Sequence, residues 1–395
     1  MMVQHAWRPF AIISLALCMG TIGTALASPL YPLYQELWHL LPSQITYIFV
    51  AYMFGCLATL LFFGRASNSF GFLRTLQVGL IFVTAGLLLS AFASHALWLG
   101  VGRFIIGIAS GLISTSAMLG LMHTIPASHK AHAPQLSSII TVIGFSLGPF
   151  IGGAIAQFSS APLLTPYLPI IAGAILCFMA LLYLKSPVIE AQPFSIAPHL
   201  ELPVAAARTH FFIAGLTAFS AFGAFSLFAS LSASFVKDLI PWHGPLVSGL
   251  AISSILFISA AVQFSAKSLS AVRSLNYGLI FMLVSCLLLA LCMYTQWSLL
   301  FVISDIGVGL GHGLGIMGSF GLIHQMTNSQ NRAAVISTYL FMGYLGTIVP
   351  IVAVGYCADV WGLNLAVIGF GIGMALLCGS LFFWHRQQKA LLLTE

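Results

Sequence analysis

Long apolar segments, separated by short polar connections, run through almost the whole chain. About 20 apolar residues in a helix cross the roughly 30 Å hydrocarbon core of a bilayer. Inside hydrocarbon the backbone must satisfy its own hydrogen bonds, and helices do so within each segment. The sequence therefore predicts an all-α integral membrane protein with twelve transmembrane helices, near residues 10–33, 44–63, 75–93, 97–122, 135–158, 165–184, 210–234, 245–265, 275–293, 298–321, 333–356 and 363–384.

The charge content excludes a soluble protein. Only 5% of the 395 residues are charged, against about 25% in a typical soluble chain. The net charge of +6 comes from scattered residues rather than a basic patch, so we expect no nucleic-acid partner. The seven cysteines show no CxxC spacing, which argues against a disulfide framework or a zinc site. We expect no cofactor.

The first apolar segment imitates a signal peptide. Ala25-Leu26-Ala27 before Ser28 resembles a signal-peptidase site. The apolar run nevertheless continues to Leu33, which makes it long enough to span the membrane. We expect a retained first helix.

The basic residues indicate how the chain is oriented. Cytoplasmic loops of membrane proteins are enriched in Lys and Arg. With twelve spans, Lys237 alone falls on the side opposite the termini, and Arg103 lies within a span. Both termini are therefore expected in the cytoplasm, together with Arg8, Arg65, Arg74, Lys130, Lys185, Arg208, Lys267, Arg273, Arg332, Arg386 and Lys389.

One interruption divides the chain into two halves. Residues 186–209 contain four prolines and are too short for a folded domain. We expect six-helix bundles over 1–185 and 210–395, joined by this cytoplasmic linker. The halves resemble copies, since His123 precedes Pro149 by the same 26 residues that separate His324 from Pro350. Such repeats are typical of secondary transporters.

The segment GFSLGPFIGG, from Gly144 to Gly153, carries the most specific motif. Gly144, Gly148 and Gly152 are four residues apart, which leaves one helix face bare for close helix packing. Pro149 removes a backbone donor beside that face. The segment resembles the fifth-helix motif of proton-coupled drug antiporters in the major facilitator superfamily. RFIIGIASG, from Arg103 to Gly111, resembles the fourth-helix motif of that superfamily, and SPLYPLY, from Ser28 to Tyr34, resembles the end of its first helix.

This resemblance covers nearly the whole chain. It implies two pseudo-symmetric six-helix bundles, the major facilitator fold, in a bacterial cytoplasmic (inner) membrane. It also implies alternating access by a monomer, with a small molecule, protons and the lipid bilayer as partners. The loop GRASNSFGFLR resembles the superfamily's signature loop through Gly64, Gly71 and Arg74. It departs from that loop at Asn68, where an acid is usual, and after Gly71, where Phe and Leu replace a basic pair. The latch that this loop forms in the family is therefore expected to be weaker here, or built from hydrogen bonds.

Two ionisable residues inside spans are candidates for function, because charges within a membrane are costly and rarely incidental. Low dielectric disfavours the charged form of Asp305, which suits a proton carrier. Arg103 is a candidate charge partner, or a ligand for an anionic substrate, because its planar fork fits carboxylate and phosphate groups. A structural role for both, as an ion pair or through bonds to neighbouring backbone, stays open.

Several further side chains are candidate ligands for the substrate or for protons. His312 lies seven residues after Asp305, on about the same helix face, and is a second proton-coupling candidate, with hydrogen-bonded packing as the alternative. Phe222 and Phe225 belong to a run of phenylalanines spaced every three residues, from Phe219 to Phe228. Some should line an apolar substrate cavity, and the others should face lipid or packing partners, with lipid-facing packing as the default for most. His123, His129 and His132 lack nearby acids or cysteines, so we expect no metal site.

The leading hypothesis is a proton-coupled secondary transporter that exports a small amphipathic or apolar compound. One alternative is a proton symporter that imports a small metabolite or organic anion. A membrane-embedded enzyme or assembly factor is less favoured, because no nucleophile triad or metal-ligand set is present in the sequence. The sequence has no GxxxxGK[ST] pattern, so nothing in it supports ATP-driven transport.

Overall fold

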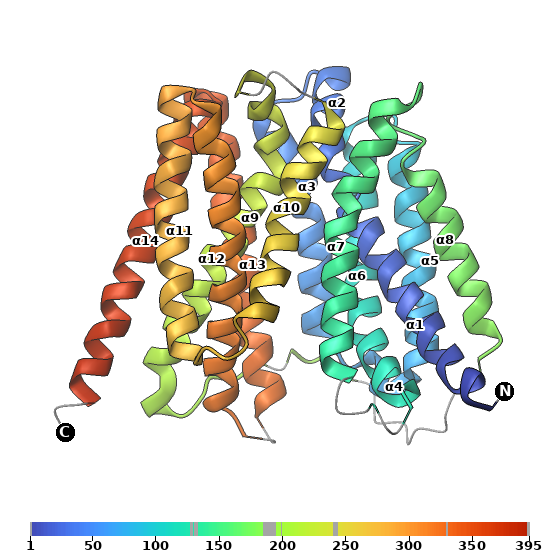
Figure 1. Ribbon diagram of the computed structural model, residues 1–395. Coiled ribbons are helices and arrows are strands. Elements are labelled where there is room, and N and C mark those ends of the chain that lie inside the picture. The colour runs from blue at the N-terminus through green and yellow to red at the C-terminus, as the bar shows by residue number, and fades with distance from the viewer. Residues whose placement is uncertain are drawn as a thin grey trace. The chain divides into compact units, whose positions relative to one another are not determined.

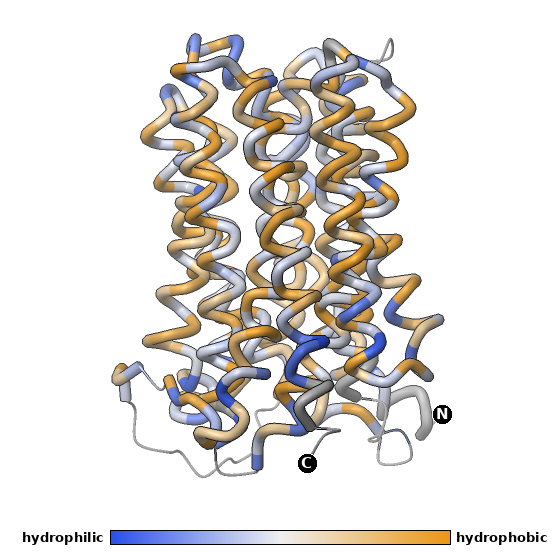
Figure 2. The backbone as a smooth tube through the Cα atoms, turned by 90° about the vertical axis from the view of Figure 1, so that its left-hand side faces the viewer, coloured by the Kyte–Doolittle hydropathy of each residue, from blue (hydrophilic) through white to orange (hydrophobic). Residues whose placement is uncertain are grey.

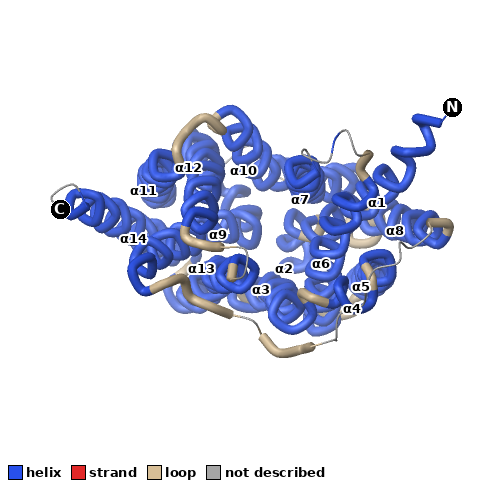
Figure 3. Tube along the Cα trace, turned by 90° about the horizontal axis from the view of Figure 1, so that it is seen from below, coloured by secondary structure: helices blue, strands red, loops and turns tan. Residues whose placement is uncertain are grey.

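The described chain is entirely helical. The computed structural model describes residues 2–126, 129, 133–184, 195–198, 200–239, 244–328 and 331–392. Within these residues there are helices and connections but no strand (Figure 3). Hydrophobic residues follow the lengths of the helices, and hydrophilic ones gather toward their ends and the connections (Figure 2). The predicted all-α class is confirmed.

Each predicted span after the first overlaps one long helix, although several helices extend beyond the predicted bounds (Figure 1). Among the described residues, eleven helices are long and apolar enough to cross a membrane, and α8 is a shorter apolar helix of 16 residues. Twelve spans and cytoplasmic termini therefore stay predictions. The main helices are α1 (Met2–Ala25), α3 (Pro42–Ala58), α5 (Phe72–Ala91), α6 (Ala96–Thr124), α7 (Ala133–Phe158), α8 (Tyr167–Leu182), α9 (Arg208–Leu239), α10 (Pro245–Ser265), α11 (Ala271–Thr295), α12 (Ser298–Gln325), α13 (Arg332–Trp361) and α14 (Leu363–Leu392).

The first span is interrupted where its prolines lie. Helix α1 ends at Ala25, a 3-10 turn follows at Ser28–Leu30, and α2 (Tyr31–Trp38) completes the span. Pro29 and Pro32 each occupy one of the first two positions of these short helical segments. Proline fits there because the first helical N–H groups have no intrahelical partner. The predicted continuous first span is thus a broken one.

The contacts group the chain into two compact units. The first contains Met1–His39, Tyr47–Pro198 and Gly244–Ser253, and the second contains Leu40–Thr46, His199–His243 and Ser254–Glu395. Helices α3 and α10 each contribute residues to both units. The predicted bundle limits at residues 185 and 210 stay predictions, and part of the predicted linker lies outside the described residues.

The glycine stripe of α7 packs directly on α1 within the first unit. A Cβ atom added at Gly148 would lie 2.8 Å from the carbonyl oxygen of Ile22, and one at Gly144 would overlap the Thr21 hydroxyl. One at Gly152 would meet the carbonyl oxygen of Leu26, the residue that follows α1. Helix α7 continues past Pro149 to Phe158. Small residues are thus required where the two backbones approach, as in other membrane helix pairs.

Gly148→Leu should destabilise the protein by about 1–3 kcal/mol, because the added side chain must separate two closely packed helices. Thermal unfolding of the purified protein in detergent would measure the loss. Gly373→Leu in α14 is the matched control, since no atom lies within 4 Å of a Cβ built there. Equal unfolding temperatures for the two variants would contradict the close approach.

Candidate functional site

Asp305 is a buried carboxyl on α12 with an incomplete set of partners. Its side chain is 6% exposed. Its Oδ2 accepts a hydrogen bond from the Ser254 hydroxyl of α10 at 2.6 Å. Its Oδ1 is buried and has no hydrogen-bond partner among the described residues. A buried charge with one neutral partner is strongly disfavoured, so this carboxyl requires a proton or a bound ligand.

His312 lies two turns further along α12 and also contacts α10. Its Nδ1 is 2.9 Å from the Ser259 hydroxyl, which in turn accepts a hydrogen bond from the Gln263 amide at 3.1 Å. Both α12 side chains therefore turn toward α10, as their seven-residue spacing predicts. The α10 residues were not predicted from the sequence. The four-residue spacing of Ser259 and Gln263, which places them on one helix face, could have indicated them.

Two phenylalanines of α9 cover the His312 ring. The Phe222 ring stacks on it with centroids 6.0 Å apart and planes inclined by 24°, and the Phe225 centroid lies 5.9 Å away. Phe222 also contacts Tyr344 of α13 edge to face at 6.1 Å. Together these residues form an aromatic cluster around the His312 imidazole.

Phe228, the last phenylalanine of the run, packs inside the second unit. Phe228 is 1% exposed and lies against Phe301 of α12, with centroids 5.7 Å apart. Phe228 therefore faces a packing partner, one of the orientations expected for phenylalanines of this run. The physical reason is that α9 packs against several other helices of the same unit.

Arg103 is buried in the first unit and bound to backbone. It is 1% exposed. Its Nη1 donates to the Thr24 carbonyl oxygen of α1 at 2.7 Å, and its guanidinium carbon lies 5.1 Å from the centre of the Tyr52 ring. The Nε atom has no hydrogen-bond partner within the part of the chain that the structure describes. The expected bond to neighbouring backbone is present, and one donor is left for a ligand.

Tyrosine hydroxyls near α5 and α8 form a second polar cluster in the first unit, which the sequence analysis did not identify. The Tyr34 hydroxyl lies 3.0 Å from that of Tyr167 and 3.3 Å from the Ser90 carbonyl oxygen. Tyr52, beneath Arg103, has its hydroxyl 3.5 Å from that of Ser110. No sequence spacing links these tyrosines, because each comes from a different helix.

The candidate residues fall into two groups. Asp305, His312, Phe222 and Phe225 lie together in the second unit, whereas Arg103 belongs to the first. Arg103 is nevertheless the eighth residue of α6 and Asp305 the eighth of α12. Gly107 and Gly111 follow Arg103 at the same intervals at which Gly309 and Gly313 follow Asp305. Both patterns are consistent with the predicted repeat.

The signature-like loop is held by apolar packing. Gly64 follows the π-helical turn Thr59–Phe63, and Asn68 lies in the short helix α4 (Ala66–Phe70). Gly71 has φ 85°, a conformation that favours glycine. Phe72, at a position usually basic in the family, is 1% exposed and stacks on His123 of α6 at 5.8 Å.

The described residues contain no group of three or more His, Cys, Asp or Glu side chains that could hold a metal ion. His123 instead stacks on Phe72, and the His129 ring lies 5.1 Å from that of Trp7. His132 lies outside the described residues.

Curated transporters resemble half of the chain or less. The riboflavin transporter RibZ of Clostridioides difficile is 25% identical over 191 residues, 48% of this chain and 41% of that protein. The human synaptic vesicular amine transporter is 26% identical over 212 residues, 50% of this chain and 39% of that protein. Multidrug resistance protein 2 of Bacillus subtilis is 26% identical over 151 residues, 38% of this chain and 37% of that protein. The matches thus span well under two thirds of these relatives.

Similarity in fold extends over the whole chain. The crystal structure of a bacterial homologue of the human lysosomal transporter Spinster matches with a TM-score of 0.72 at 13% identity, covering 98% of this chain and 97% of that one. The family model described as Major Facilitator Superfamily matches residues 13–349. The protein therefore belongs to the major facilitator superfamily, whose members are membrane transporters.

Proposed function

We propose that this protein is a proton-coupled secondary transporter that exports a small amphipathic or apolar compound by alternating access across a bacterial cytoplasmic membrane. The observation that carries the proposal is the buried carboxyl of Asp305, with one oxygen bound to Ser254 and the other without a partner among the described residues. Multidrug efflux proteins among the relatives support export.

In this proposal Asp305 binds a proton from outside and releases it to the cytoplasm, while the substrate moves the opposite way. Protonation neutralises the carboxyl, which lowers the energetic penalty of carrying it through states that differ in solvent access. Ser254 holds one carboxyl oxygen, so the other is free to take the proton. His312, hydrogen-bonded to Ser259 on the same pair of helices, is proposed as a second proton-coupling group.

The substrate is proposed to bind at the aromatic cluster of Phe222, Phe225 and Tyr344 beside His312. Phe222 and Phe225 supply apolar ring faces, and His312 and Gln263 supply polar contacts. This composition suits a compound with a flat or bulky apolar body and few polar groups. It is compatible with the compounds after which the relatives are named, riboflavin, amines and drugs, without selecting one of them.

The glycine motifs are proposed to serve conformational change rather than binding. Gly144, Gly148, Pro149 and Gly152 carry no titratable group, so they cannot move a proton. The bare face lets α7 and α1 adjust while they remain packed. Gly64, Asn68, Gly71 and Arg74 are assigned to the turn that resembles the family's latch.

The Gly148→Leu variant should transport substrate slowly while still binding it. Lost binding would instead place the glycine motif of α7 in the substrate site.

A second candidate function is proton-coupled import of a small organic anion or metabolite. The observation that favours it is Arg103, whose buried Nε is without a partner among the described residues while Nη1 holds the Thr24 carbonyl oxygen. A guanidinium with a spare donor can bind a carboxylate.

Asp305→Asn should abolish transport driven by a pH gradient, because the amide cannot carry a proton. Purified protein in liposomes, with a lipophilic fluorescent dye as substrate and an imposed gradient, would measure this. Asp305→Glu should retain part of the coupling. Glu36→Gln, which alters an exposed acid of α2, should leave proton-coupled transport unchanged. Unaltered proton coupling in Asp305→Asn would refute the assignment.

Phe222→Ala should weaken binding of the same dye about three- to tenfold, the loss expected when one aromatic contact is removed. Equilibrium binding in detergent would provide the dissociation constant. Phe212→Ala is the control on the same helix, since Phe212 is 39% exposed. Similar dissociation constants for both variants would exclude Phe222 from the site.

Arg103→Lys separates export from anion import, because lysine keeps the charge but loses the planar donor fork. If the protein exports apolar compounds, liposomes containing this variant should retain most of the dye transport. Organic-anion uptake by the wild-type protein, lost in Arg103→Lys, would establish the second candidate and overturn export.

A further inference from the structure

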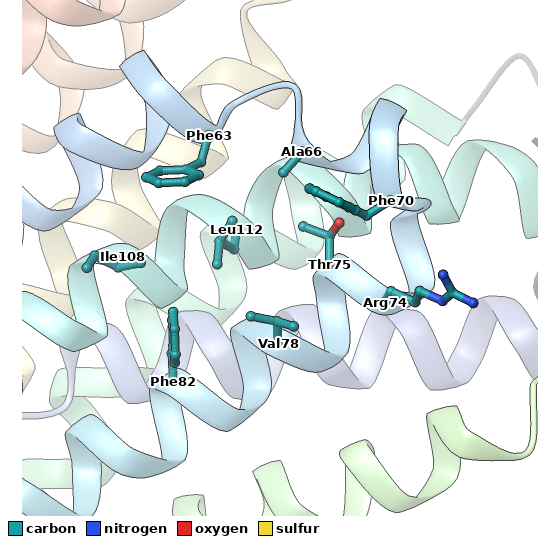
Figure 4. Close-up of a pocket in the computed structure, with 9 residues that line it drawn as sticks. All are labelled: Phe63, Ala66, Phe70, Arg74, Thr75, Val78, Phe82, Ile108 and Leu112. Carbon is teal, nitrogen blue, oxygen red and sulfur yellow. The ribbon is translucent and has the colours of Figure 1, made fainter. Parts of the chain in front are cut away.

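An apolar groove lies at one end of the first unit, where the signature-like loop meets α5 and α6. It has a volume of about 590 Å³. Phe63 and Phe70, from the π-helical turn and α4, form one wall. Val78 and Phe82 of α5 form another, and Ile108 and Leu112 of α6 form the floor (Figure 4). All of these residues belong to the same unit.

The groove is open rather than sealed. Phe63, Phe70 and Val78 are 43%, 53% and 43% exposed. In a membrane protein such surfaces face hydrocarbon, and a lipid chain is the matching occupant. Arg74, Val78 and Phe82 follow one another at intervals of four residues on α5, so the groove runs about 12 Å along this helix. An acyl chain can therefore lie along the groove rather than touch it at one point.

Arg74 places a cation at the end of this apolar surface. Its side chain is exposed, and its guanidinium extends beyond the apolar side chains at the rim (Figure 4). No hydrogen bond or ion pair of this guanidinium is found among the described residues. Arg65, on the same loop, instead donates to the Ala197 carbonyl oxygen at 3.4 Å. Arg74 is thus the cation of this loop that is available to a ligand.

The start of α5 adds to the positive potential at this end of the groove. Arg74 is the third residue of α5, and Gly71 provides no side-chain cap. The first amides of α5 therefore carry unsatisfied donors, and the helix dipole favours a negative group there. In α11 the third residue is also an exposed arginine, Arg273, but the Ser270 hydroxyl caps that helix. Arg273 is therefore a matched control for Arg74: an exposed arginine at the same helix position, but on a capped helix.

We propose that this groove binds an anionic phospholipid, with an acyl chain along Val78 and Phe82 and its phosphate on Arg74. The apolar lining accepts a chain, and the Arg74 guanidinium selects the charged headgroup. The positive-inside prediction places the loop at the cytoplasmic leaflet, where anionic lipids attract basic residues. The lipid is proposed as a resident ligand, separate from the transported compound. The site lies in the loop that replaces the family's charge network with apolar packing.

Native mass spectrometry of the purified protein, with phosphatidylglycerol and phosphatidylcholine offered together, tests the proposal. Wild-type protein should retain phosphatidylglycerol preferentially. Arg74→Gln should reduce that retention about fivefold, the effect expected for one basic contact to an anionic headgroup. Arg273→Gln should leave it unchanged. Equal losses in the two variants, or no loss in Arg74→Gln, would overturn the site.

A second pair of variants tests the apolar part of the groove and leaves Arg74 and Arg273 unchanged. Val78→Trp should fill the groove and displace the lipid, whereas Val284→Trp, at a 45% exposed valine of α11, should not. Glycerol 3-phosphate, which has a phosphate but no acyl chain, should fail to compete. Competition by this compound would show a phosphate site without a lipid groove. Retention of lipid in Val78→Trp would reject the groove.

Discussion

Inside hydrocarbon, a backbone N–H or C=O group without a hydrogen-bond partner costs several kcal/mol, and no water is present to supply one. The described chain meets this constraint by being helical throughout. The remaining departures from regular helix have local explanations. The break between α1 and α2 coincides with Pro29 and Pro32, and the π-helical turn Thr59–Phe63 leads into the loop before α4.

Lipid chains are as apolar as leucine, so apolar burial contributes little to the association of membrane helices. Close contact between small residues takes its place. The Gly144, Gly148 and Gly152 stripe brings α7 onto the backbone of α1. The same stripe carries the family resemblance, and the geometry supplies the physical reason for it: any side chain there would meet backbone or Thr21.

Two buried ionisable side chains are only partly satisfied within the described part of the chain. Arg103 holds the Thr24 carbonyl oxygen and lies over an aromatic ring, but its Nε has no partner there. Asp305 has the Ser254 hydroxyl on Oδ2 and no described partner on Oδ1. The proposed coupling centres on Asp305, because a carboxyl can gain and lose a proton whereas a guanidinium keeps its charge. His312, enclosed by Phe222, Phe225 and Ser259, joins the polar seam between α10 and α12 to the proposed substrate surface.

The sequence by itself determined the helical class, the approximate positions of most long helices, the family and the two ionisable residues within apolar helices. These follow from hydropathy, from the length needed to cross a bilayer, and from the spacing of a few glycines, all of which are local properties. Only the tertiary structure decided the partners: Ser254 and Ser259 beside α12, Thr24 beneath Arg103, the inward packing of Phe228, and the groove that ends at Arg74. Those contacts depend on which faces of separate helices meet, and in a uniformly apolar chain the spacing along one helix carries little information about its neighbour.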